Sequence, residues 1–247
     1  MALSHRQKLI IISLLIYWPV IFVLAHVPIP QLVRKAGVSD KILHFIAYLV
    51  LVFLLWFTVS PDMKVNWRRA AAWWVLLITV WYGVVDEVLQ SFVAGRSCDV
   101  MDFFADLAGV VTGLILFTLF TFWPAFLVVT GITIFAMTNL ARTSLADLLP
   151  AANVAFHLFA YAFFATLWIH NMHLFLPIKA RKLKWLIVAS ALPIGFLLAV
   201  TSFSIISGRV FRLQDTIIAA VGITAVVITI YLTSLFHRRS TQKLSPK

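Results

Sequence analysis

The chain has 247 residues, of which 62% are hydrophobic and only 12% are charged, and its mean hydropathy is +1.00. No soluble core of this length needs so much apolar surface, so the composition excludes a water-soluble globular protein and indicates that the bilayer is the solvent. The net charge of +11 does not indicate nucleic-acid binding, because the basic residues are dispersed at the ends of apolar stretches, as the positive-inside rule predicts.

A membrane-spanning helix needs roughly 20 mainly apolar residues. Eight segments meet this requirement: 9–26, 41–59, 71–91, 103–123, 125–141, 153–172, 185–204 and 215–236. We therefore expect an all-α polytopic membrane protein with about eight transmembrane helices. The first segment should stay uncleaved, because Leu24-Ala25-His26 lacks a small-residue cleavage pattern. Pro19 and Pro193 should each kink the helix that contains them.

The lysines and arginines predict the orientation. With the N-terminus inside, 13 of the 20 basic residues fall on the inner side and 7 on the outer side. Both termini should therefore be cytoplasmic, in a bacterial inner membrane.

Ionisable and strongly polar residues between 41 and 113 gather where the chain enters or leaves lipid on the outer face. They are Lys41, His44, Tyr48, Asp86, Glu87, Gln90, Arg96, Asp99, Asp102 and Asp106. A charge near the middle of the bilayer costs about 2.5–3.5 kcal/mol on insertion scales, so an acid at such depth is a candidate functional residue. Helix topology alone should bring these residues together.

The chain also matches itself at an ungapped offset of 113 residues. The matched pairs are His44 and His157, Tyr48 and Tyr161, Arg96 and Arg209, Asp102 and Asp215, and Gly109 and Gly222. The pattern predicts two parallel four-helix repeats, 1–123 and 124–247. The second repeat lacks most of the acids, since Asp86, Glu87, Gln90, Asp99 and Asp106 become Ala199, Val200, Phe203, Arg212 and Ala219. We expect the first half to carry the site and the second to serve as scaffold or partner surface.

Three stretches carry a family resemblance. They read Asp40-Lys41-Ile-Leu-His44-Phe45-Ile-Ala-Tyr48, Asp86-Glu87-Val-Leu-Gln90-Ser-Phe92, and Gly95-Arg96-Ser-Cys-Asp99-Val-Met-Asp102-Phe-Phe-Ala-Asp106-Leu-Ala-Gly109-Val-Val-Thr-Gly113. Over roughly residues 8–120 the chain resembles the VanZ-like family of bacterial membrane proteins. The resemblance implies a four-helix membrane unit. It also implies a link to the cell envelope, because one member is associated with resistance to the glycopeptide teicoplanin. It implies no settled biochemical activity.

Several residues also have a purely structural interpretation. Asp102 at a helix start can cap free amides instead of having a functional role. A structural role is equally open for His44 and Arg96, since both recur in the second half, whereas Asp106 and the pair Asp86 and Glu87 favour function. A histidine with several carboxylates could hold a divalent cation. However, no zinc-ligand spacing such as HExxH is present, so cofactor and metal dependence stay open.

The sequence therefore predicts an acid-rich pocket that opens to the outer leaflet and binds or acts on an anionic lipid-linked envelope precursor. Candidate acid–base groups are His44, Asp86, Glu87, Asp99, Asp102 and Asp106, and candidate substrate-binding groups are Lys41, Tyr48, Gln90 and Arg96. Arg96 and Lys41 would hold the phosphate. A proton-coupled transporter or flippase and a non-catalytic envelope assembly factor are the alternatives. The substrate, the reaction and the oligomeric state stay open.

Overall fold

A computed structural model describes residues 3–27, 40–93, 98–139, 149–176, 183–208 and 211–243. Within these ranges the secondary structure is helical and contains no strand. The helices are α1 (His5–His26), α3 (Asp40–Val59), α4 (Ala70–Gln90), α5 (Val100–Leu119), α6 (Phe122–Asn139), α8 (Pro150–Phe175), α9 (Leu183–Ile206) and α10 (Leu213–Lys243). All eight contain a stretch long and apolar enough to cross a membrane, which confirms the expected all-helical membrane class.

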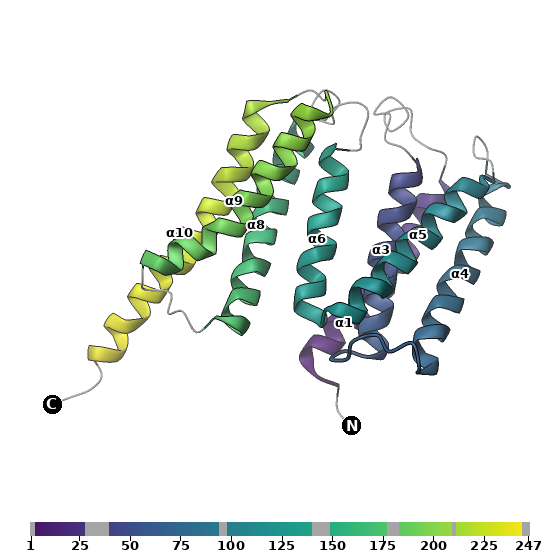
Figure 1. Ribbon diagram of the computed structural model, residues 1–247, viewed down its shortest axis with the longest axis horizontal. Helices are drawn as coiled ribbons and strands as arrows, with labels where there is room; N and C mark the ends of the chain where they lie inside the picture. Colours follow the sequence, from purple (N-terminus) through teal and green to yellow (C-terminus); the bar gives the residue numbers. More distant parts are fainter. Residues whose placement is uncertain are drawn as a thin grey trace. The chain divides into compact units, whose positions relative to one another are not determined.

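The helices form two compact units (Figure 1). The first comprises α1, α3, α4, α5 and α6 as far as Ala136, and the second comprises α8, α9 and α10. This division describes packing alone. The repeat boundary expected between residues 123 and 124 stays a prediction.

The first unit is built around α3, which contacts α1, α4 and α5. Leu49, Leu51 and Val52 are completely buried, although they point in different directions around the helix. A helix that is apolar on every side and buried on most of them lies at the centre of its bundle. Phe53 extends this core toward α6, because its ring stacks on Phe126 with the ring centroids 5.2 Å apart.

Neighbouring helices of the first unit run in alternating directions, and contacts at both ends show this. At one end, Arg6 at the start of α1 donates to the carbonyl oxygen of Pro61 at 3.2 Å and pairs with Asp62, both just after α3. The backbone N–H of Val65 donates to the carbonyl oxygen of Phe117 near the end of α5 at 2.8 Å. The opposite end therefore collects the end of α1, the start of α3, the end of α4 and the start of α5.

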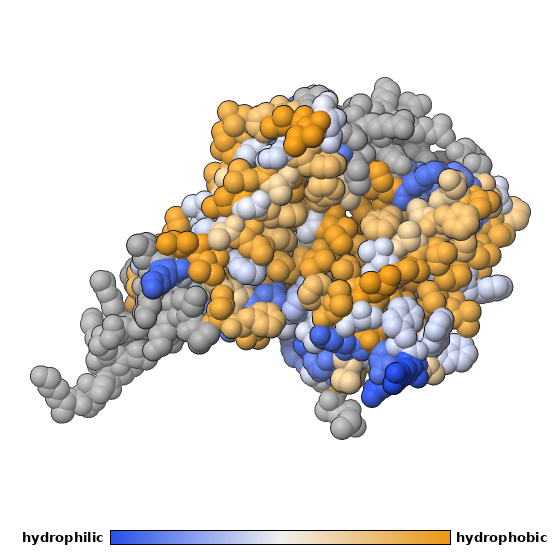
Figure 2. Space-filling view, in the orientation of Figure 1, coloured by the Kyte–Doolittle hydropathy of each residue, from blue (hydrophilic) through white to orange (hydrophobic). Residues whose placement is uncertain are grey.

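The outward helix faces are apolar. On α4, for example, Trp73, Trp74 and Trp81 are 56%, 61% and 68% exposed. Figure 2 shows hydrophobic residues in orange over the sides of the helices, with hydrophilic residues in blue near helix ends. Such large exposed apolar surfaces are stable in lipid rather than in water.

In the second unit, α8 and α9 both pack on α10, and α8 also contacts α9. Trp185 and Tyr161 are among its most buried side chains. The Asn153 side chain at the start of α8 donates to the Asp215 carboxylate at the start of α10 at 2.7 Å. The unit therefore has its own core and its own polar contact between helix starts.

Candidate functional site

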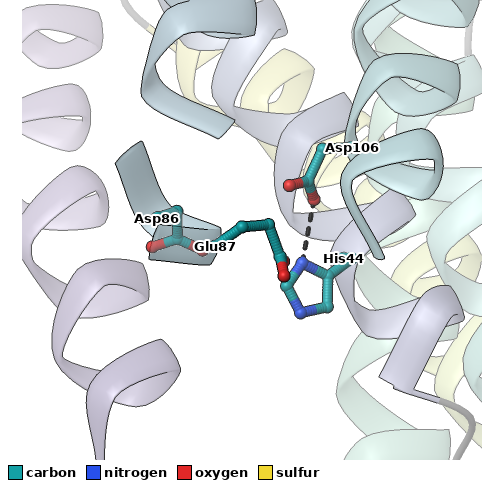
Figure 3. A group of neighbouring side chains, drawn as sticks. All are labelled: His44, Asp86, Glu87 and Asp106. Atoms are coloured by element: carbon teal, nitrogen blue, oxygen red, sulfur yellow. Dashed lines mark hydrogen bonds and ion pairs between the residues drawn. The ribbon is translucent and has the colours of Figure 1, made fainter. Parts of the chain in front are cut away.

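Four side chains from three helices meet at the end of the first unit where α3 and α5 begin. We call them the inner cluster: His44 from α3, Asp86 and Glu87 from α4, and Asp106 from α5 (Figure 3). Each is at most 7% exposed. One donor atom from each side chain lies within 4.8 Å of the other three donor atoms. Imidazole nitrogen and carboxylate oxygen atoms are both ligands of divalent cations, so these are the residues that could hold a metal.

His44 and Asp106 are directly paired. Nδ1 of His44 lies 2.9 Å from Oδ1 of Asp106, and both side chains are buried. The other carboxylate oxygen, Oδ2, faces α4, because a Cβ added to Gly83 would lie 3.4 Å from it. A carboxylate bonded to one ring nitrogen fixes the orientation of an imidazole and strengthens it as a base or ligand.

The adjacent acids Asp86 and Glu87 point to different partners, as their offset of about 100° along the helix predicts. Asp86 accepts a hydrogen bond from the Gln90 side chain at 2.8 Å, one helical turn later. Glu87 extends toward the His44 ring in Figure 3, and its Oε2 accepts from the backbone N–H of Asp99 at 3.0 Å. Gln90 and Asp99 thus hold the two carboxylates in place.

The site also includes a histidine that the sequence reasoning missed. His26, in the last turn of α1, places its Nδ1 3.8 Å from Oδ1 of Asp86. Its position in the sequence could have identified it, because the end of the first span lies at the same level as the end of α4 and the start of α3. His44 is therefore not the sole histidine of this region.

Three residues form a separate group that we call the rim: Lys41, which is exposed, Asp99, which is half-buried, and Asp102, which is buried. The Lys41 ammonium lies 2.8 Å from the Asp99 carboxylate and 3.2 Å from the Asp102 carboxylate. Asp99 also caps α5, since its side chain accepts from the backbone N–H of Met101 at 2.8 Å. The Lys41 ammonium lowers the pKa of the Asp99 carboxyl. The structure pairs Lys41, which was expected to bind substrate, with these rim acids.

Two tyrosines lie beside the inner cluster. The rings of Tyr48 and Tyr82 stack with centroids 5.7 Å apart, and Tyr82 meets Trp18 of α1 edge to face at 5.3 Å. Tyr48 is 2% exposed. These rings separate the polar residues from the apolar core of the bundle.

A cavity of about 300 Å³ lies between α1, α3 and α4 and reaches the inner cluster. Its apolar part is lined by Val20, Ile21, Leu24, Leu43 and Ile46, and its polar part by Asp40, His44, Tyr48, Tyr82 and Asp86. The lining therefore changes from hydrocarbon to ionisable groups within one cavity.

Of the ten polar residues singled out from the sequence, nine lie at this end of the unit. Seven of them are buried, whereas Lys41 is exposed and Asp99 is half-buried. Arg96 lies outside the described residues. Tyr48 and Gln90 were expected to bind substrate, and the structure places Tyr48 and Asp86, the partner of Gln90, at the cavity.

The fold and the site together define a polytopic helical membrane protein with a buried centre of acids and histidines at one end of its first unit. Residues 6–121 match the VanZ/LLP1 family model, and this range contains the whole inner cluster and rim. Residues 6–121, just under half of the chain, are therefore similar to the VanZ/LLP1 family, as the resemblance over residues 8–120 led us to expect. The match ends before the second unit, so the degenerate second copy stays a prediction. No curated protein and no solved structure matches the chain.

Proposed function

We propose that this VanZ-like protein binds, and acts on, an anionic lipid-linked precursor of the bacterial cell envelope. The observation that supports this most directly is the cavity between α1, α3 and α4, whose apolar walls lead to the inner cluster. A lipid-linked precursor has the same division into a hydrocarbon chain and a charged head. Ligand sites generally combine mostly apolar walls with a few convergent polar groups.

The hydrocarbon chain would lie along α1 and α3. Val20 and Leu24 of α1 line the cavity together with Leu43 and Ile46 of α3. The α1 helix is the least embedded wall, since only Ile10 and Leu14 among its residues are buried. A lipid could therefore enter sideways from the bilayer without first crossing water.

The head group would reach His44. Its ring is oriented by Asp106 and lies at the polar end of the cavity. A histidine held in this way can accept or deliver a proton at a bound substrate, and Glu87 lies beside it as a second proton-carrying group. We therefore assign the acid–base role to the inner cluster, and a positioning role to Lys41, Asp99 and Asp102.

The orientation follows from the basic residues. The excess of lysine and arginine on the side of the termini supports cytoplasmic termini, an inner-membrane location and an inner cluster near the outer leaflet. A late envelope step would then be carried out where glycopeptides meet their targets, which is consistent with the family's association with glycopeptide resistance.

Mass spectrometry of lipids that co-purify with the protein tests the proposal. Wild type should retain an anionic lipid-linked species. Ala25→Trp should lose most of it, because an indole would fill the cavity that Ala25 lines. Leu15→Trp is the matched control, since Leu15 lies on the same helix and is 68% exposed. Equal lipid retention by all three proteins would contradict the proposal.

A second measurement distinguishes chemical conversion of the lipid from its transport. Glu87→Gln should leave folding and lipid binding intact while it abolishes chemical conversion of the bound lipid. Proton-driven movement of the lipid across liposomes, lost in the same variant, would instead favour the flippase alternative.

A further inference from the structure

We propose that the inner cluster is a divalent-cation site in which His44, Glu87 and Asp106 are ligands and Asp86 completes the set. This inference deepens the proposed function and rests on it for its biological role. Metal binding itself is measurable without any lipid.

The spacing of the donor atoms fits a single ion. Metal–ligand bonds of about 2.1 Å place neighbouring ligands of an octahedral ion about 3.0 Å apart and opposite ligands about 4.2 Å apart. Nδ1 of His44 and Oδ1 of Asp106 are 2.9 Å apart, so an ion bound by both atoms would displace the proton that they share. The whole set lies within 4.8 Å, so a contraction of less than about 1 Å would close the shell around an ion.

Buried polar atoms without partners provide the second observation. Oε1 of Glu87 and Oδ2 of Asp106 have no hydrogen-bond partner within the described part of the chain. The Tyr48 hydroxyl, on a residue that is 2% exposed, also has none there, and Tyr48 lies within electrostatic range of Asp106 and Glu87. Buried polar groups are nearly always satisfied, so these unpaired oxygen atoms in and beside the inner cluster indicate a missing ligand.

The charge balance favours a cation as that ligand. Three carboxylates converge in the inner cluster, and Lys41, the lysine that the described residues place at this end of the unit, is held by the rim acids. His44 and His26 would both have to carry protons on both ring nitrogens to offset two of the three negative charges of the carboxylates. Uncompensated carboxylates are costly in an apolar interior, whereas a bound divalent ion offsets two negative charges without any proton.

Neighbouring groups are arranged to support ligands. Gln90 donates to Asp86, and the backbone N–H of Asp99 donates to Oε2 of Glu87, which leaves Oε1 of Glu87 for the ion. Such hydrogen bonds from the surrounding residues orient ligands and are a regular part of metal sites. Because the ligands come from α3, α4 and α5, the ion would also join three helices.

The mixed donor set indicates the type of ion. Carboxylates suit Mg²⁺, Ca²⁺ and Mn²⁺, and imidazole suits transition ions, so Mn²⁺ is the probe that accepts both. The ion also answers a difficulty of the proposed function. An acidic cluster repels a phosphate, whereas a cation held by that cluster can bridge to phosphate oxygens.

Titration with Mn²⁺ tests the site. The full-length protein in detergent is stripped with a chelator, and free Mn²⁺ is followed by electron paramagnetic resonance. We expect about one bound Mn²⁺ per chain, and at least a tenfold weaker affinity for both Glu87→Gln and Asp106→Asn. Asp62→Asn is the control, because Asp62 lies at the other end of the unit and pairs with Arg6, so its affinity should equal that of wild type.

Thermal unfolding with and without Mn²⁺ shows whether a variant that does not bind the ion is still folded. Mn²⁺ should raise the melting temperature of wild type and Asp62→Asn, and leave that of Glu87→Gln unchanged. The inference is overturned if chelator-stripped wild type binds no stoichiometric Mn²⁺, or if both cluster variants bind it as tightly as wild type. Retained lipid on a protein that binds no stoichiometric Mn²⁺ would defeat the metal site and leave the proposed function standing. Stoichiometric Mn²⁺ binding by a protein that retains no lipid would contradict the proposed function and leave the metal site standing.

Discussion

Gly109 of α5 lies so close to Phe45 of α3 that a Cβ atom at Gly109 would stand 2.4 Å from the Phe45 carbonyl oxygen. The two backbones therefore touch directly, one residue beyond His44 on α3 and about one helical turn beyond Asp106 on α5. This contact sets the distance between α3 and α5 and so the distance between the paired side chains. The absence of a side chain at Gly109 is thus a requirement of the site as well as of the fold.

Replacing Gly109 with alanine should destabilise the first unit by about 1–3 kcal/mol or more, because the clash is with backbone that cannot rotate away. Thermal unfolding in detergent measures this. Gly195→Ala is the matched control, since nothing lies within 4 Å of a Cβ at Gly195, and alanine there should stabilise α9 by up to about 1 kcal/mol. Equal unfolding temperatures for the two variants would contradict the close contact.

The same contact recurs 113 residues later. A Cβ at Gly222 of α10 would stand 2.5 Å from the carbonyl oxygen of Leu158 in α8. Both residues are the equivalents of Gly109 and Phe45 at the expected repeat offset. This agreement supports two copies of one helix crossing, of which the second has lost most of the acids.

The two halves should consequently respond differently to loss of an acid. Asp215→Asn weakens the contact with Asn153 and should lower stability by about 1 kcal/mol while lipid retention and Mn²⁺ binding persist. Glu87→Gln should leave stability nearly unchanged in chelator and abolish Mn²⁺ binding. Unfolding curves and binding titrations of both variants check this. Loss of binding in Asp215→Asn at unchanged stability would assign part of the site to the second half.

The rim predicts a dependence of stability on pH. The pKa of Asp99 is lowered in the folded protein by the Lys41 ammonium. Its contribution is therefore present above the unfolded pKa of about 3.9, and it is lost as the pH falls through the lower folded pKa. Between about pH 6 and about pH 3, the melting temperature of wild type should fall further than that of Asp99→Asn. Asparagine still caps a helix, so the difference isolates the ion pair. Parallel curves for the two proteins would show that the pair contributes nothing.

Tyr17 should control how α1 closes the cavity. Its hydroxyl donates to the Ala47 carbonyl oxygen of α3 at 3.0 Å. Tyr17→Phe removes this bond and should cost about 1 kcal/mol of stability, while the exchange of bound lipid becomes faster because α1 is held less firmly. Hydrogen exchange of α1 together with lipid off-rates measures both effects. A phenylalanine variant with unchanged exchange and off-rates would mean that the hydroxyl does not hold α1.

Much of the fold was predictable from the sequence. Apolar length alone identified the eight spans, since any helix crossing lipid must satisfy its backbone internally and expose apolar side chains. Alternating direction then placed Lys41, Glu87 and Asp106 at one end, because each short connection returns the chain to the face it has just left. The start of α5 was less predictable: the helix begins at Val100, ahead of the apolar segment, because Asp99 caps it.

The composition of the site was only partly predictable. Topology predicts the depth of a residue but not the rotation of its helix, and rotation decides whether an acid faces a neighbour, a cavity or lipid. This is why the sequence could not tell that Lys41 pairs with Asp99 and Asp102, or that His26 joins Asp86.

By itself, then, the sequence determined a helical membrane protein with its polar residues gathered at one level, because the bilayer imposes length and depth on every span. The tertiary structure decided which of those residues are buried together, because that depends on how closely the helices approach. Where Gly109 lets α5 touch α3, His44 and Asp106 come within hydrogen-bonding distance, and four donor atoms converge on one point.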